Sequence, residues 1–261
     1  MGHQRLGKLP AHRLLPDIVR YLVTGGTPTE LLVEQVTEVG RYALKRALKD
    51  PVFVEALWLL IKLPQAAASK DYASALADIG MGARVPASVA ELMVAFDRAL
   101  ERVQRRVHAG ATDLGEIARQ AGLAALGEAV EAGMPMWSPT VADVQASAAA
   151  LRSPEKFGAL AHHFHANIVE RVIHYYVDRN LHELVGADRV ARSVHDLAAY
   201  NSAIRRHCIE AAQIMRAFAR DWLGKNHYRD GRDISREDAR RFSAYAVEKI
   251  GNELKNRKGP A

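Results

Sequence analysis

Residues 193–223 have the sequence SVHDLAAYNSAIRRHCIEAAQIMRAFARDWL, and this stretch decides the fold class. Its apolar side chains recur every three or four residues, which is the spacing that places side chains on one face of an α-helix. These residues are Leu197, Tyr200, Ile204, Cys208, Ala211, Met215, Phe218 and Trp222. The pattern predicts one continuous helix from Ser193 to Leu223, which must bury its apolar face against another helix.

A second long helix is predicted from Glu155 to about Leu184. Its apolar face comprises Ala161, Phe164, Ile168, Val172, Tyr175 and Tyr176. We expect this helix to pack against the helix of residues 193–223, because both carry a continuous apolar face. Earlier in the chain, small residues recur at the same helical spacing and predict close approach between helix backbones. They are Gly115, Ala118, Gly122, Ala125 and Ala129.

Helix starts are marked along the chain by side chains that can accept a hydrogen bond from the first-turn amides. The predicted starts lie at Thr27, Asp50, Ser88, Thr112, Ser153, Ser193 and Ser235. Alternating β-branched runs joined by tight turns, which are typical of antiparallel sheets, are almost absent. The sequence therefore predicts an all-α multi-helix bundle of about nine or ten helices, with two long amphipathic helices in its C-terminal half.

Composition and charge indicate how the bundle is organised. The strongest break is Gly133 to Pro139, where two prolines interrupt the helical pattern. Residues 1–150 contain 16 Lys and Arg against 16 Asp and Glu, whereas residues 151–261 contain 20 against 14. We expect either a neutral N-terminal lobe (1–133) and a basic C-terminal lobe (140–261), or one continuous domain.

The composition also excludes several classes of protein. The chain has 261 residues, of which 49% are hydrophobic and 25% charged, as in folded globular proteins. The single cysteine, Cys208, cannot form an internal disulfide, and we interpret it as a buried structural residue in a cytoplasmic protein. The most apolar run, Val52 to Leu63, is too short to cross a membrane and predicts a buried helix. No nucleotide-binding fingerprint is present, so we expect no cofactor.

A basic face is predicted opposite the apolar face of residues 193–223. It collects His195, Ser202, Arg205, Arg206, Ile209, Gln213, Arg216 and Arg220. At 1.5 Å per residue, Arg205 to Arg220 span about 22 Å, enough to follow several phosphates. More arginines follow: Arg229, Arg232, Arg236, Arg240 and Arg241. The alternative is a solvated helix surface, in which Glu237 and Arg241 form an ordinary ion pair at i,i+4.

A histidine stripe lies on one face of the helix that starts at Glu155. Its members are His163, Asn167, Glu170, His174 and Asp178. Imidazole and carboxylate groups on one helix face could bind a metal, with His207 or Glu210 completing the site from a neighbouring helix. The alternative is a solvent-facing polar stripe on an amphipathic helix.

We expect a non-catalytic helical accessory or scaffold subunit of a larger assembly. Its basic C-terminal face would bind RNA, DNA or an acidic protein partner, and no membrane. The predicted contact residues are Arg205, Arg206, Arg216, Arg220, Arg229, Arg232, Arg236 and Arg240. One alternative is a metal-dependent helical-bundle enzyme that uses His163, Glu170 and His174. Another is a homo-oligomer in which the arginine face meets a neighbouring copy.

Overall fold

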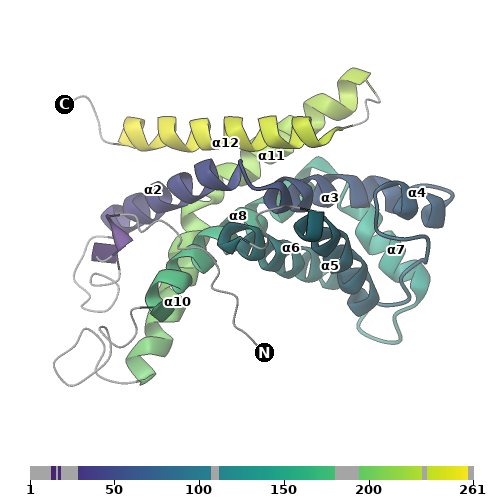
Figure 1. Cartoon of the computed structure of the whole chain (residues 1–261), viewed down its shortest axis with the longest axis horizontal. Coiled ribbons are helices and arrows are strands. Elements are labelled where there is room, and N and C mark those ends of the chain that lie inside the picture. The colour runs from purple at the N-terminus through teal and green to yellow at the C-terminus, as the bar shows by residue number, and fades with distance from the viewer. Residues whose placement is uncertain are drawn as a thin grey trace.

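The computed structural model describes the backbone of residues 13–15, 17–18, 29–106, 112–179, 194–230 and 234–257, and most of their side chains. All the regular elements in these ranges are α-helices, which confirms the predicted fold class (Figure 1). They are α2 (Thr29–Ala47), α3 (Pro51–Ala67), α4 (Tyr72–Asp78), α5 (Val89–Arg106), α6 (Asp113–Glu131), α7 (Val141–Ala150), α8 (Pro154–Arg179), α10 (Val194–Ala211), α11 (Gln213–Asp230) and α12 (Arg236–Arg257).

Helix α3 forms the centre of the bundle. It contacts α4, α5, α6, α7 and α12, so nearly all of its side chains are buried. A helix that is covered on nearly every side must be mostly apolar all round, which explains the run of Val52 to Leu63, where Glu55 and Lys62 are the charged residues, and confirms that this run is a buried helix. Within the described ranges, no helix combines the length and the apolar character that a membrane span requires.

All five of the predicted helix starts that lie within the described residues carry the expected caps. Asp50 accepts from the amides of Val52 (2.8 Å) and Phe53 (3.3 Å) at the start of α3. Thr112 accepts from the amide of Gly115 (2.9 Å) at the start of α6. Ser88, Ser153 and Ser235 accept in the same way from amides three residues on. Thr27 and Ser193 lie outside the described residues. The sequence reading missed the capping box of Thr140 and Asp143 that starts α7.

The prediction of one continuous helix over residues 193–223 is wrong. Two helices occupy this stretch, α10 and α11, and a turn at Ala212 separates them. The carbonyl of Ile209 accepts a hydrogen bond from Nε2 of the buried His162 on α8 (2.8 Å). Just beyond it, the amide of Met215 bonds to the carbonyl of Ala212 (2.9 Å), three residues back. A side chain that enters the i to i−4 ladder is a known cause of such breaks.

The predicted pairing of the two long helical segments is confirmed, because α8 packs against both α10 and α11. The segments run antiparallel: Phe157, near the start of α8, meets Trp222 on α11, with ring centroids 6.4 Å apart. Ile204, Cys208 and Met215 of the predicted apolar face are buried in this interface. Burial raises the pKa of the Cys208 thiol well above its ordinary value, as expected for a structural cysteine.

Small residues on α6 allow the predicted close approach of its neighbours. An added Cβ at Gly122 would lie 3.0 Å from Cε1 of Phe96 on α5. Gly122, Ala118 and Ala125 are all buried. Helix α6 therefore packs tightly between α3, α5 and α8.

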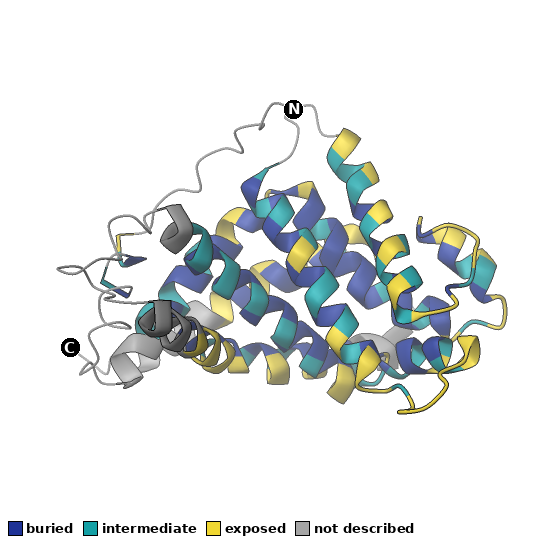
Figure 2. Cartoon of the chain, turned by 90° about the horizontal axis from the view of Figure 1, so that it is seen from below, coloured by how far each residue is buried: buried dark blue, intermediate teal, exposed yellow. Residues whose placement is uncertain are grey.

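The segment Gly133 to Pro139 forms the connection between α6 and α7. Buried apolar side chains on both sides of it, such as Val130, Val144 and Phe157, belong to one continuous core. Figure 2 shows this arrangement, with buried ribbon faces turned inward and exposed faces turned outward. The neutral and basic halves of the sequence therefore share one core.

Candidate polyanion-binding site

The start of α12 is fixed against α3 by contacts of two side chains. Nε1 of Trp58 donates to the carbonyl of Ile234 (2.8 Å), and the guanidinium carbon of Arg236 lies 3.7 Å from the centre of a Trp58 ring. Arg236 also forms a two-pronged ion pair with Glu55, in which Nη2 lies 2.7 Å from Oε1. Glu55 is buried, and its hydrogen bond raises the pKa of Arg236. These contacts set the position of α12 over the first turns of α3.

A concave basin of about 630 Å³ opens beside this junction. Four parts of the chain line it: the connection from α2 into the first turn of α3, the end of α4 with the turn that follows it, the C-terminal end of α5 and the N-terminal end of α12. Its cationic residues are Lys49, Arg102, Arg106, Arg236 and Arg240. Its carboxylates are Asp50, Glu55 and Asp78. The basin therefore has an excess of positive charge.

Two of the three carboxylates in the basin are buried and already engaged. Asp50 caps α3 and also accepts from the hydroxyl of Thr112, and Glu55 binds Arg236. The exposed carboxylate is Asp78. Negative charge that could oppose an anionic ligand is therefore sparse at the mouth of the basin.

The cations of the basin differ in how they are occupied. Within the described part of the chain, the side chains of Lys49 and Arg106 form no hydrogen bond or ion pair. Arg102 donates to the carbonyl of Gly80, and Arg240 pairs with Glu237 at 2.8 Å. Lys49 and Arg106 can thus bind an anion without breaking an existing contact.

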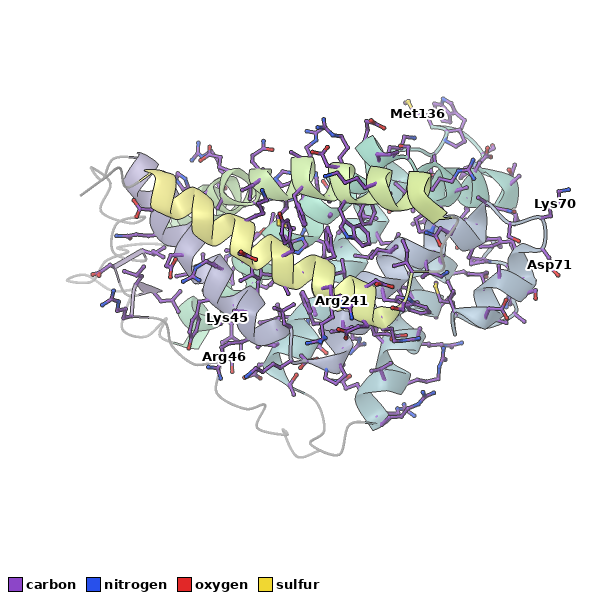
Figure 3. The ribbon with its side chains drawn as sticks, turned by 90° about the horizontal axis from the view of Figure 1, so that it is seen from above. Lys45, Arg46, Lys70, Asp71, Met136 and Arg241 are labelled. Atoms are coloured by element: carbon purple, nitrogen blue, oxygen red, sulfur yellow. The ribbon has the colours of Figure 1, made fainter. Side chains whose placement is uncertain are left out.

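Further basic residues lie around the basin. Lys45 and Arg46 form the last turn of α2, one turn before Lys49. Figure 3 looks onto α12 and shows Lys45, Arg46 and Arg241 on the same side of the molecule. Last-turn cations also complement the negative end of their own helix dipole. Arg241 pairs with Glu237 at 3.3 Å, as the i,i+4 spacing predicts.

Sequence reasoning missed Lys49, Arg102 and Arg106, because they belong to the half of the chain that is neutral overall. The available signal was local: basic residues end α5, just as they end α2. A charge count over a long segment hides such clusters. The fold joins the ends of these helices to the basic start of α12.

The arginine face predicted on residues 193–223 is exposed, as its helical position requires. Arg205, Arg206, Arg216 and Arg220 all reach solvent, and Nε of Arg220 donates to Asp221 (3.0 Å). The eight predicted arginines do not all line one site. Arg205 lines a cleft between α6, α8 and α10, whereas Arg236 and Arg240 line the basin. The side chain of Arg229 and all of Arg232 lie outside the described part of the chain.

The side chain of Asp178, the last member of the histidine stripe, lies outside the described residues, and the four described members are not grouped as a three-ligand metal site. His163 Nδ1 lies 3.1 Å from Glu128 Oε2 on α6, while His174 Nε2 lies 3.8 Å from Glu170 Oε1. Across the described residues, no three His, Cys, Asp or Glu side chains are placed to hold a metal ion together. His207 pairs with Glu210 at 3.3 Å. The described members of the stripe are half-buried, and Asn167, Glu170 and His174 line a cleft together with residues of α6.

Comparisons of the chain with protein-family models, with curated proteins and with solved structures found no match.

Proposed function

We propose that this protein is a non-catalytic helical accessory protein that binds the phosphate backbone of nucleic acid in the basin between α5 and α12. The observation that carries this proposal is the convergence of five cationic side chains from three separate parts of the chain on one concavity. Arginine suits this ligand because its planar fork of N–H groups can bind two phosphate oxygens at once.

The cationic residues of the basin would have different roles in binding. Lys49 and Arg106 would make the first phosphate contacts, because neither has to give up a partner. Arg240 would follow by releasing Glu237, an exposed pair of the kind that contributes little to stability. Arg236 would remain bound to Glu55 and hold α12 in place.

Among the described residues that line the basin, there is no aromatic side chain on which a base could stack. Base recognition in single strands uses exposed aromatic side chains, but Trp58, next to the basin, is buried beneath Arg236. We therefore expect binding without sequence preference and with a steep dependence on salt. If Lys49, Arg102, Arg106 and Arg240 each neutralise one phosphate of a duplex, the slope of log K against log salt should be roughly −3 to −4.

The test is a salt series of fluorescence anisotropy measurements with labelled single- and double-stranded RNA and DNA. The double variant Lys49→Glu with Arg106→Glu reverses two basin cations. The variant Lys70→Glu with Arg152→Glu changes the net charge equally at exposed positions outside the basin. A third variant changes the α10–α11 arginines to Glu: Arg205, Arg206, Arg216 and Arg220.

We expect the basin variant to lose nucleic-acid affinity and to show a flatter slope of log K against log salt. The control variant at Lys70 and Arg152 should stay close to wild type in both. If both variants lose the same affinity, the loss follows from the change in net charge, which would contradict a defined binding site. If only the α10–α11 variant loses nucleic-acid affinity, the contact with nucleic acid lies on the α10–α11 face and not in the basin. If the wild type binds none of the four nucleic acids at low salt, the proposal is wrong, and the basic surface then fits an acidic protein partner.

A further inference from the structure

The connection between α6 and α7 carries an exposed apolar tip, which consists of Met136 and Trp137. Met136 is 89% exposed and Trp137 is 83% exposed, more than any other large apolar side chain in the described part of the chain. Val141, at the start of α7, is exposed as well. Figure 3 shows Met136 at an edge of the molecule, away from Lys45 and Arg241. Tryptophan and methionine are enriched in protein interfaces, so the tip has the composition of a contact surface.

The tip is held at both of its ends. On the α6 side, Met134 is partly buried and packs against the core. On the α7 side, the capping box of Thr140 and Asp143 fixes the start of the helix. Pro135 and Pro139 flank the two exposed side chains and restrict the backbone between these anchors. Such anchoring reduces the conformational entropy that the tip loses when it binds a partner.

A hollow of about 300 Å³ lies between the end of α6, α7 and the first turns of α8. Gly133 lines this hollow and Trp137 follows four residues later, so at most about 14 Å of chain separates the tip from the hollow. The buried Leu151 and Leu160 line it as well. More accessible alanines complete the apolar lining: Ala129, Ala132 and Ala159. A benzene ring fits an apolar cavity of about 150 Å³, so the hollow is large enough for an indole ring.

The position of the tip beside the hollow suits a second copy of the chain. Trp137 does not fill the hollow of its own copy, because its side chain is almost fully exposed. When a protruding and a concave feature lie side by side, a twofold rotation can place each tip in the hollow of the other copy. Such an interface is closed at two copies. A tip and a hollow on opposite faces would instead build an open chain of molecules.

Charge around the tip also favours a second copy over an anionic partner. Residues 128–156 include the tip and most of the hollow, and they contain four acidic residues and two basic ones. The acidic residues are Glu128, Glu131, Asp143 and Glu155, and the basic residues are Arg152 and Lys156. The chain as a whole has a net charge of +6. This face therefore lacks the excess of positive charge that would attract nucleic acid or an anionic membrane and would repel a second copy.

The area of the contact sets the strength that we expect. A buried tryptophan side chain covers about 150–250 Å², and the wall of the hollow loses a similar area. Two such insertions, together with Met136 and Val141, give an interface of about 1,000 Å² in total, at the low end for specific complexes. A dimer of this size should dissociate in the micromolar range.

We propose that the face formed by the tip and the hollow is the interface of a weak, twofold-symmetric homodimer. Trp137 of each copy inserts its indole ring into the hollow of the other copy, and Met136 covers the apolar rim. The contact is separate from the basin and goes beyond nucleic-acid binding.

The test is sedimentation velocity of the full chain at concentrations from about 1 to about 300 µM, a range that brackets the expected dissociation constant. The tip variant carries Trp137→Gln with Met136→Gln. The hollow variant carries Ala129→Arg with Ala132→Arg, two positions near the end of α6 that are not buried and at which cations suit the helix dipole. Val94→Gln is the matched control, because Val94 is an apolar side chain on α5 that is 48% exposed and lies outside this face. Circular dichroism checks that each variant is folded.

A mixing experiment tests whether the two copies exchange their tips. The hollow variant still has Trp137, and the tip variant still has an open hollow, so a mixed dimer keeps one of the two insertions. The mixture should therefore form a dimer that is weaker than the wild-type dimer but stronger than that of either variant alone.

We expect a wild-type dimer, a dissociation constant at least about 30-fold higher in the tip and hollow variants, and no change in Val94→Gln. A wild type that stays monomeric at the highest concentration would overturn the proposal. Binding of that monomer to phosphatidylcholine vesicles, lost in the tip variant, would then assign the tip to a membrane surface. A dimer that survives in either variant, or variants that do not associate on mixing, would also overturn the proposal. Nucleic-acid binding is measured separately, so either proposal can fail without the other.

Discussion

Acidification should destabilise this protein through His165 on α8. This side chain is 1% exposed and lies against aromatic rings, with centroids 5.3 Å from Phe164 and 6.4 Å from Phe242. Its Nδ1 donates to the carbonyl of Ala161 (2.6 Å), while its Nε2 has no hydrogen-bond partner in the described structure. A proton on Nε2 would place a charge and an unpaired donor in this apolar site. Burial and the neighbouring His162 both lower the pKa of His165, to about 4.

The size of the effect follows from the difference in pKa between the folded and unfolded chains. The unfolded imidazole titrates near its ordinary value of 6.5, so below that pH the unfolded state binds more protons than the folded state. Stability is therefore complete above about pH 6.5 and falls as the pH drops toward about 4. At about 1.4 kcal/mol per pKa unit, the loss between about pH 7 and about pH 5 is about 2 kcal/mol.

Urea unfolding followed by circular dichroism at the two pH values measures this loss. His165→Leu removes the titrating group at similar volume, so the variant should lose about 2 kcal/mol less than wild type over the same pH interval. His163→Gln on the same helix is the control, because the side chain of His163 is 41% exposed and lies outside the apolar site around His165. If His165→Leu loses as much stability on acidification as wild type, the assignment to His165 is refuted.

Two further predictions concern packing and an ion pair. Gly122→Ala should destabilise the fold by about 1 kcal/mol or more, because the new methyl group would press on Phe96. At Gly127 on the same helix, an added methyl group meets only an ordinary contact at 3.6 Å, so Gly127→Ala should raise the free energy of unfolding by about 0.5 kcal/mol through helix propensity. Chemical denaturation measures both variants. Equal effects of the two substitutions would contradict the packing argument. Arg236→Ala should lower the free energy of unfolding by about 2 kcal/mol, because it leaves the buried Glu55 without its partner. Adding Glu55→Gln to this variant should recover part of the lost stability, because it removes the unpaired charge. An unchanged thermal midpoint in Arg236→Ala would show that this pair does not fix α12.

Much of the fold could be predicted because its signals are local. Helix starts at Asp50, Thr112 and Ser235 depend on atoms within three residues of the cap. Exposure of Arg205 and Arg216, and burial of Cys208, follow from helical periodicity within a single segment. The break at Ala212 was missed because its cause, His162, lies 47 residues from the carbonyl it binds.

The candidate sites were predictable only in part. Arg240, Glu170, His174 and Arg205 belong to patterns visible in the sequence, but those patterns do not say which groups face each other. The basin needed Lys49, Arg102 and Arg106 from a segment with no net charge.

The sequence by itself determined the all-helical fold class, half of the helix starts in the described ranges, and which faces of those helices are buried, because capping and periodicity act over one or two turns. Only the tertiary structure decided which helices meet. The side-chain pairs that join distant helices connect residues far apart in the chain, 181 positions for Arg236 and Glu55 and 62 for Tyr175 and Asp113. Such pairs form when whole helix faces pack to bury apolar surface, and the polar groups carried on those faces are brought together as a consequence.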